Sequence, residues 1–119
     1  MNKLFKVALI VEGIFGLGFV LAPGAMLGPF GVTLNAIATS FVRLFGSALI
    51  SFSILLWFAS KSDNSKFGKG VVYSMFFYFF VSTVLLVIAQ LAGQMNALGW
   101  SVVSIHVVFL VWFGYFVVK

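Results

Sequence analysis

Long apolar runs separated by short polar or glycine-rich segments dominate this sequence. Four runs reach the ~20 residues that a helix needs to cross ~30 Å of hydrocarbon. Their approximate bounds are 4–22, 36–59, 70–92 and 99–118. A transmembrane β-strand would alternate apolar and polar residues, whereas the stretch from Val84 to Ala89 contains no polar residue. The pattern therefore predicts four membrane-spanning helices in a single domain covering residues 1–119.

Proline, glycine and polar residues mark the connections between the predicted helices. Pro23 follows the first apolar run and predicts that the helix ends there. The connection that follows carries Leu27 and Phe30, so we expect it to lie in the membrane interface or to be tucked into the bundle. Residues 60–65 are predicted to form a polar turn. The short turn at 93–96 predicts that the last two helices are antiparallel neighbours.

The composition supports an integral membrane protein. The chain has 119 residues, of which 63% are hydrophobic and 8% charged. Its mean hydropathy is +1.22. So little polar surface would not cover a soluble globule of this size. We therefore predict an all-α integral membrane four-helix bundle.

The lysines predict how the bundle is oriented. They lie near the two chain ends and in the connection between the second and third runs, and the other two connections carry no charge: Lys3, Lys6, Lys61, Lys66, Lys69 and Lys119. Positive charge is retained on the cytoplasmic side of membranes. We expect an antiparallel up-down bundle with both termini cytoplasmic, in a cell membrane, with the bacterial inner membrane as its setting.

The net charge of +5 has two further consequences. The lysines are explained by topology, and no basic patch with interleaved aromatic residues indicates nucleic-acid binding. Anionic membrane lipids are the expected partners of the loop from Lys61 to Lys69. Lys3 and Lys6 before an apolar run are also typical of a signal peptide, but Glu12 within that run favours a retained membrane helix.

Two ionisable residues lie within the apolar runs, Glu12 in the first and Arg43 in the second. Hydrocarbon penalises a charged side chain by roughly 3 kcal/mol or more, so such residues often mark a site. Ala8, Glu12 and Gly16 share one helical stripe, as do Ser40, Arg43, Ser47 and Ser51. We expect these stripes to face each other, with Gly13 and Gly16 beside Glu12 and Gly46 beside Arg43 allowing a close approach at which Glu12 pairs with Arg43.

His106 is the third candidate. A rise of ~1.5 Å per residue places it at nearly the depth of Arg43, and Ser82 and Thr83 within a turn of both. The sequence thus predicts a polar level at Glu12, Arg43, Ser47 and His106. Purely structural roles stay open: the ion pair fixing helix register, the histidine bonded within the core, the serines bonded to their own helix, and Arg43 snorkelling to the surface.

Recognised catalytic and metal-binding motifs are absent from the sequence. One histidine, no cysteine and two carboxylates do not provide the ligand set of a metal site. There is no G-x-S-x-G elbow and no phosphate-binding loop. We therefore expect no enzymatic activity, no catalytic residue, no metal and no obligatory cofactor. A quinone or a lipid remains open as a ligand, and a homo-oligomer or a larger membrane complex as an assembly.

Two segments carry a resemblance to a known family: LAPGAMLGPFGV at 21–32 and FVRLFGSALISFSILLWFA at 41–59. With the R-x-x-G element at Arg43 and Gly46, they resemble the DoxX-like small four-helix bacterial membrane proteins. The resemblance implies a compact bundle, commonly of unassigned function, in a family whose relatives include membrane subunits associated with quinone-linked redox enzymes. It also implies a role for Arg43.

A transporter is the alternative hypothesis. Small multidrug resistance proteins are similar in length and carry an essential glutamate in their first helix, a place that Glu12 would take here. Against this comparison stand the different residues around Glu12 and the presence of Arg43, which would occupy the carboxylate. Our leading hypothesis is a non-catalytic accessory or ligand-binding protein with a buried Glu12–Arg43 site, and the alternative is a small proton-coupled transporter.

Overall fold

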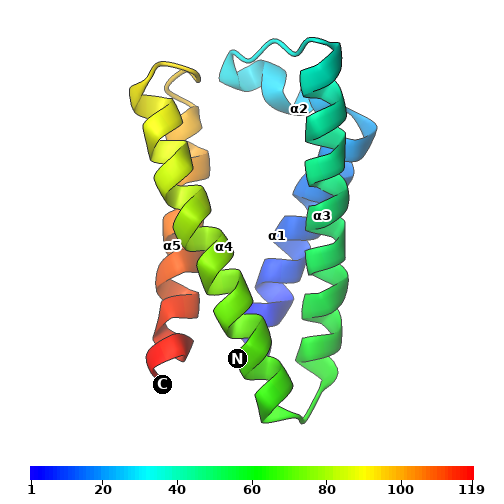
Figure 1. Cartoon of the computed structure of the whole chain (residues 1–119), viewed down its shortest axis with the longest axis vertical. Coiled ribbons are helices and arrows are strands. Elements are labelled where there is room, and N and C mark those ends of the chain that lie inside the picture. The colour runs from blue at the N-terminus through cyan, green and yellow to red at the C-terminus, as the bar shows by residue number, and fades with distance from the viewer.

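In the computed structural model, which describes residues 1–119, the chain is all-helical (Figure 1). The elements are α1 (Asn2–Leu21), α2 (Pro23–Leu27), the 3-10 turn η1 (Gly28–Phe30), α3 (Ala36–Lys61), α4 (Ser65–Leu91) and α5 (Gly99–Val118). Helices α1, α3, α4 and α5 are each long and apolar enough to cross a membrane. The predicted all-α class and the four candidate membrane helices are confirmed.

The predicted start of the third long helix at residue 70 was wrong, because α4 begins at Ser65. The Asn64 side chain caps this helix by accepting a hydrogen bond from the Phe67 backbone N–H at 3.1 Å. Such a cap satisfies one of the N–H groups that a helix leaves unpaired at its start. The length of the apolar run could not reveal that the first turn of this helix is polar. The predicted turn at 60–65 therefore comprises only residues 62–64, because α3 ends at Lys61 and α4 begins at Ser65.

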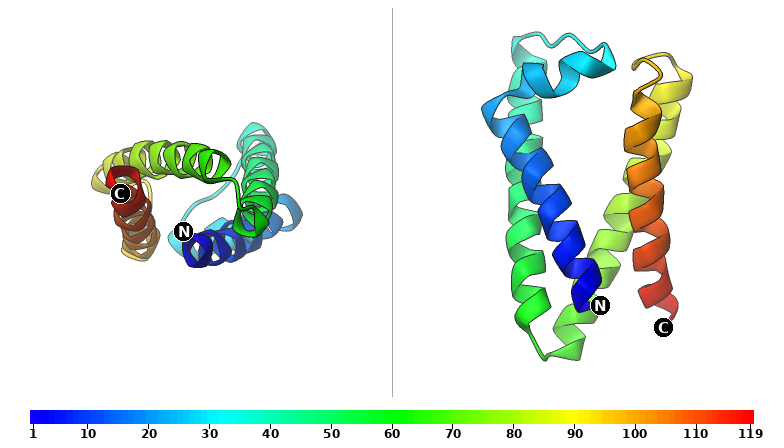
Figure 2. Two further views of the ribbon diagram at one scale, coloured as in Figure 1. Left: turned by 90° about the horizontal axis from the view of Figure 1, so that it is seen from below. Right: turned by 180° about the vertical axis from the view of Figure 1, so that it is seen from behind.

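The long helices form two pairs, α1 with α3 and α4 with α5 (Figure 2). The pairs converge at the end that holds both termini and the α3–α4 connection, and they diverge toward the opposite end (Figure 1). We call the first the lysine-rich end, because all the lysines belong to its segments. The second is the lid end. It is formed by residues 22–35, which we call the lid, and by the α4–α5 turn at residues 92–98.

Small residues bring α1 and α3 together. A Cβ atom added to Gly16 would lie 2.9 Å from the Gly46 carbonyl oxygen, and one added to Gly46 would lie 2.8 Å from that of Gly16. Ser53 Oγ donates a hydrogen bond to the Leu9 carbonyl at 2.7 Å across the same contact. Close backbone approach at small residues is typical of membrane helix pairs. The predicted close approach of these two helices at small residues is confirmed, and it occurs at Gly16 and Gly46.

The packed core occupies the lysine-rich half. Eleven buried residues from all four long helices form it: Leu4, Phe5, Ala8, Leu56, Ala59, Val71, Val72, Met75, Phe79, Phe109 and Phe113. Phe79 stacks on Phe109 with ring centroids 5.0 Å apart and on Phe113 at 5.7 Å. Lys69 Nζ donates a hydrogen bond to the Phe116 carbonyl and so ties α4 to the end of α5. This core holds the two helix pairs together where they converge.

Candidate functional site

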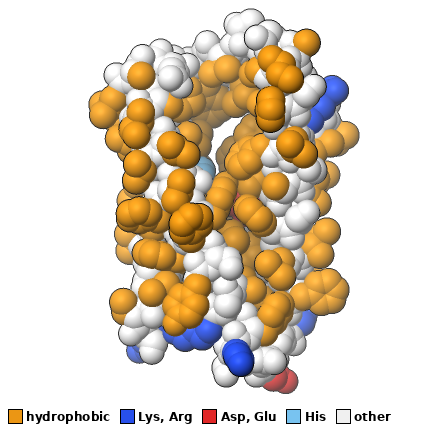
Figure 3. Space-filling view, in the orientation of Figure 1, with side chains coloured by type: hydrophobic (Ala, Val, Ile, Leu, Met, Phe, Trp, Pro, Cys, Tyr) orange, Lys and Arg blue, Asp and Glu red, His pale blue; other side chains and the backbone are white.

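A cavity lies between the two helix pairs in the lid half, where the pairs diverge. Its volume is about 420 Å³, and 15 of its 18 lining residues are hydrophobic. Figure 3 shows the hollow between the pairs. The lining residues come from all four long helices and from the lid: Val11, Glu12, Phe15, Phe19, Met26, Leu27, Phe30, Val42, Phe45, Leu49, Tyr78, Ser82, Leu85, Leu86, Met95, Val102, Ile105 and His106.

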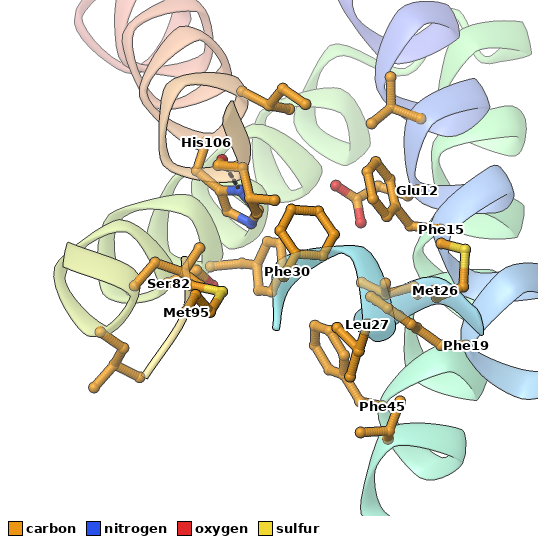
Figure 4. Close-up of a pocket in the computed structure, with 18 residues that line it drawn as sticks. Glu12, Phe15, Phe19, Met26, Leu27, Phe30, Phe45, Ser82, Met95 and His106 are labelled. Atoms are coloured by element: carbon orange, nitrogen blue, oxygen red, sulfur yellow. Dashed lines mark hydrogen bonds between the residues drawn. The ribbon is translucent and has the colours of Figure 1, made fainter. Parts of the chain in front are cut away.

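Polar side chains enter this cavity from opposite walls. Glu12 on α1 is only 4% exposed, and its carboxyl group points into the space between the pairs (Figure 4). His106 on α5 points into it from the other pair, with Tyr78 and Ser82 of α4 on the same side. A mostly apolar cavity with a few converging polar groups is the usual form of a small-molecule site. The structure thus brings Glu12, His106 and Ser82 to one cavity.

The hydrogen bond of His106 defines what its ring can offer. Nδ1 lies 2.9 Å from the Val102 carbonyl oxygen. A carbonyl oxygen only accepts, so Nδ1 must carry the proton of this bond. In the neutral ring, Nε2 is then an acceptor. Glu12 also keeps an acceptor oxygen in either protonation state. The two walls of the cavity therefore present acceptors to each other.

The predicted pairing of Glu12 with Arg43 was wrong. Arg43 is exposed and is not among the residues that line the cavity. Ser47 is also exposed, and its hydroxyl donates to the Leu44 carbonyl of its own helix at 2.7 Å. Neither residue belongs to the site, and no ion pair joins Glu12 to Arg43 in the structure.

The orientation of α3 explains this difference. The face toward α1 and the bundle interior carries Gly46, Leu49, Ser53 and Leu56, which recur at helical spacing. The stripe from Ser40 through Arg43 and Ser47 to Ser51 lies on the outer side of the helix, where all four residues are exposed. The close contact at Gly46 fixes this rotation, because only a residue without a side chain fits against Gly16. The polar stripe therefore points away from Glu12.

The lid covers one end of the cavity. Leu27 and Phe30 line the cavity, so of the two predicted placements, in the membrane interface or tucked into the bundle, the structure shows the second for these two residues. Asn96, in the α4–α5 turn, bonds the lid twice: its backbone N–H donates to the Phe30 carbonyl, and its side-chain Nδ2 donates to the Pro29 carbonyl, both at 2.9 Å. These bonds connect the two helix pairs at the lid end.

Further hydrogen bonds, from Gln90 and Leu98, hold Asn96 in position. Gln90 Nε2 donates to the Asn96 carbonyl at 2.9 Å, and the Asn96 side chain accepts from the Leu98 N–H at 3.0 Å. Gln90 is buried, and its Oε1 atom has no hydrogen-bond partner. Gly31, at φ +78°, packs against the Asn96 side chain, and this left-handed backbone suits glycine. The lid is thus held by a specific polar contact.

Sequence reasoning missed Tyr78, Gln90 and Asn96 as parts of this region. Tyr78 was hidden in the aromatic run from Phe76 to Phe80, in which composition does not reveal which ring faces inward. Asn96 was visible only as a turn residue, because its partners lie 66 and 67 positions earlier in the chain. The structure also contains no cluster of three or more histidine, cysteine, aspartate or glutamate side chains that would suit a metal ion.

Comparison of this chain with protein-family models, with curated proteins and with solved structures found no match.

Proposed function

We propose that this chain is a non-catalytic multi-pass membrane protein that binds a small amphipathic molecule in the cavity between its helix pairs. The observation that carries the proposal is the convergence of Glu12 and His106, from opposite pairs, on one largely apolar cavity. A carboxyl group is costly at membrane depth. With Arg43 directed elsewhere, a bound ligand is the partner that would offset this cost.

The chemistry of the walls favours a particular head group. Glu12 and neutral His106 both offer acceptors, so a ligand with hydrogen-bond donors, such as hydroxyl or amino groups, can bond to both, and the hydroxyl groups of Tyr78 and Ser82 can donate to its oxygens. Phenylalanine rings from both the α1–α3 pair and the lid favour an aromatic ring between them. A hydroquinone, which is the reduced form of a quinone, combines both properties. A lipid with a hydroxyl-bearing head group would offer the same hydrogen-bond donors without the aromatic ring.

The setting follows from the charge pattern. Because the lysines belong to one end of the bundle, we place that end and both termini in the cytoplasm, with the lid end outward in a bacterial inner membrane. This arrangement makes the bundle antiparallel and up-down. A relationship to the DoxX-like proteins is part of the proposal, on the strength of the two segments at 21–32 and 41–59. An accessory role in a larger membrane complex would agree with it.

Native mass spectrometry of the protein released from its own membranes tests the proposal. We expect a defined extra mass on the wild type that is lost in Glu12→Leu and in His106→Leu. Leucine fills the space of either side chain without a hydrogen-bonding group. Arg43→Ala is the matched control, because it removes an ionisable membrane residue outside the cavity, and it should retain the extra mass.

The opposite pattern would refute the proposal. If the wild type carries only generic lipids, or if both cavity variants keep the same defined mass, the polar groups serve the fold alone. Loss of the mass in Arg43→Ala with retention in Glu12→Leu would point to the outer face of α3 in place of the cavity.

A small proton-coupled transporter is the second candidate, and one observation favours it. Arg43 does not form an ion pair with Glu12, so the main argument against a proton-exchanging carboxylate is removed. Transport would also require the packed core of the lysine-rich half to open. In proteoliposomes, a transporter would release protons on addition of tetraphenylphosphonium, and Glu12→Leu would abolish the release. A pure binding protein would release none.

A further inference from the structure

The routes into the cavity decide which ligands can reach it. At the lid end, Leu27 and Phe30 cover it, and the bonds of Asn96 to Pro29 and Phe30 hold this cover in place. At the lysine-rich end, the stacked rings of Phe79 and Phe109 belong to the closed core, in which both are at most 3% exposed. The remaining routes are lateral, between the helix pairs.

A groove lies between α1 and α5 and continues the cavity on one side. It has a volume of about 410 Å³ and is lined by Val11, Ile14, Phe15, Ser104, Ile105, Val108 and Phe109. Three of these residues, Val11, Phe15 and Ile105, also line the cavity. In the right-hand view of Figure 2, α1 and α5 are the front helices of their two pairs, so both face this side of the molecule. We call this the α1–α5 groove.

The α1–α5 groove offers only apolar contacts. Its one polar residue is Ser104, and the Ser104 hydroxyl donates to the Trp100 carbonyl of its own helix at 2.8 Å. No polar group in the groove is therefore free for a ligand head group. A hydrocarbon chain is the chemistry that such a surface accepts.

A second groove lies on the opposite side, between α3 and α4. It is lined by Phe52, Tyr73, Ser74, Phe77, Tyr78, Val81 and Ser82. Tyr78 and Ser82 also line the cavity. This α3–α4 groove differs from the first because hydroxyl-bearing residues make up more than half of its lining. It suits a chain less well than the α1–α5 groove does.

Size adds a second argument. Pockets of roughly 300–1,000 Å³ hold whole drug-sized ligands, and this cavity of about 420 Å³ is near the lower limit of that range. A ring with its hydroxyl groups would fill much of it. A long chain attached to that ring must therefore lie outside the cavity, and the groove that shares three lining residues with the cavity adjoins it.

Building on the proposed function, we infer that the ligand carries a long hydrocarbon chain, such as an isoprenoid chain, that leaves the cavity through the α1–α5 groove. The head group lies between Glu12 and His106, and the chain extends past Ile105 and Ser104 into the surrounding lipid. Such a ligand enters sideways from the membrane leaflet at the lid end and does not pass through water.

Two serines provide a matched test. Ser104 and Ser74 each line one groove, are exposed, and donate a hydrogen bond to the carbonyl four residues earlier. Ser104→Trp would fill the α1–α5 groove, and Ser74→Trp would fill the α3–α4 groove. The probes are menadiol, which has no chain, and menaquinol, which carries the same ring with a long isoprenoid chain. Binding is measured in nanodiscs under reducing conditions.

We expect the wild type and Ser74→Trp to bind both probes. Ser104→Trp should bind menadiol normally and lose about tenfold or more of its affinity for menaquinol, because the filled groove excludes the chain. Retained menadiol binding shows that the variant is folded. If Ser104→Trp loses both probes, Ile14→Trp from the opposite wall of the groove replaces it, with the same expectation.

The failures of the two proposals differ. If menaquinol binds equally to the wild type and to both groove variants, or if only Ser74→Trp loses it, the chain route is refuted and the proposed function stands. If neither probe binds the wild type, or if Glu12→Leu binds both as well as the wild type does, the quinol-binding site itself is refuted.

Discussion

The lysine-rich half and the lid half are built from the same four helices but differ in how they are packed. In the lysine-rich half, Phe5, Phe79 and Phe113 are fully buried and stack across three helices. In the lid half, the phenylalanines around the cavity are only partly buried: Phe15, Phe19 and Phe30 are half-buried, and Phe45 is 42% exposed. The presence of large apolar side chains therefore does not determine whether a region closes.

The difference comes from the divergence of the helix pairs. Contacts between α1 and α3 continue into the lid half through Gly16 and Gly46, so each pair stays together while the pairs separate from each other. Lipid is as apolar as leucine, so only packing and polar contacts hold membrane helices together. Beyond the stacked phenylalanines, the edge-on contact of Phe52 with Tyr78 and the polar bonds of Asn96 connect the pairs. The closely packed core and the cavity thus lie at opposite ends of the bundle.

The largest effect should come from removing a ring of the packed half. Phe79→Ala should destabilise the protein by about 3 kcal/mol or more, because Phe79 is fully buried and contacts Phe109 and Phe113. Unfolding in mixed micelles by increasing SDS measures this loss.

The neighbouring Phe80→Ala is the control, because Phe80 is 51% exposed on the same helix and should cost under about 0.5 kcal/mol. Phe45→Ala, in the lid half, should fall between the two. If Phe45→Ala costs as much as Phe79→Ala, the two halves are equally packed and the comparison is wrong.

A smaller effect is expected where α1 meets α3. Gly46→Val should destabilise by about 1–3 kcal/mol, since its Cβ would lie 2.8 Å from the Gly16 carbonyl and from the Phe19 Cβ. The same SDS titration detects the change.

Gly70→Ala provides the control for this substitution. A Cβ at Gly70 meets no atom within 4 Å, so alanine there should be neutral or stabilising by up to about 1 kcal/mol. A Gly46→Val variant as stable as the wild type would show that the contact with Gly16 does not fix the rotation of α3.

The smallest effect on stability, but a local effect on dynamics, is expected at the lid. Asn96→Ala removes the side-chain bonds to Pro29 and Leu98 and should cost about 1 kcal/mol. Hydrogen exchange should become faster in residues 26–31 and stay unchanged in the packed half. Gln94→Ala, an exposed neighbour in the same turn, should change neither. Faster exchange throughout the chain would mean that the two halves unfold together.

Several features of the site were predictable from the sequence. The rarity of ionisable residues in apolar runs identified Glu12, and counting residues along the helices placed His106 and Ser82 near one level. Arg43 is also an ionisable residue in an apolar run, but it is exposed and does not line the cavity. Depth follows from position along a helix, but the direction in which a residue points depends on how the helix is rotated against its neighbours. For α3, the contact at Gly46 decided that rotation.

By itself, the sequence determined the helical class, the number of long helices and the approximate positions of the connections between them, because hydrocarbon requires long apolar segments with internally bonded backbones. It also placed Glu12 and His106 within two of these helices. Only the tertiary structure decided which faces of the helices meet and that the bundle opens at the lid end. It also decided that Tyr78 lines the cavity while Arg43 lies on the outer surface. These outcomes depend on contacts between residues distant in the chain, such as Gly16 with Gly46 and Asn96 with Pro29, which no local pattern encodes.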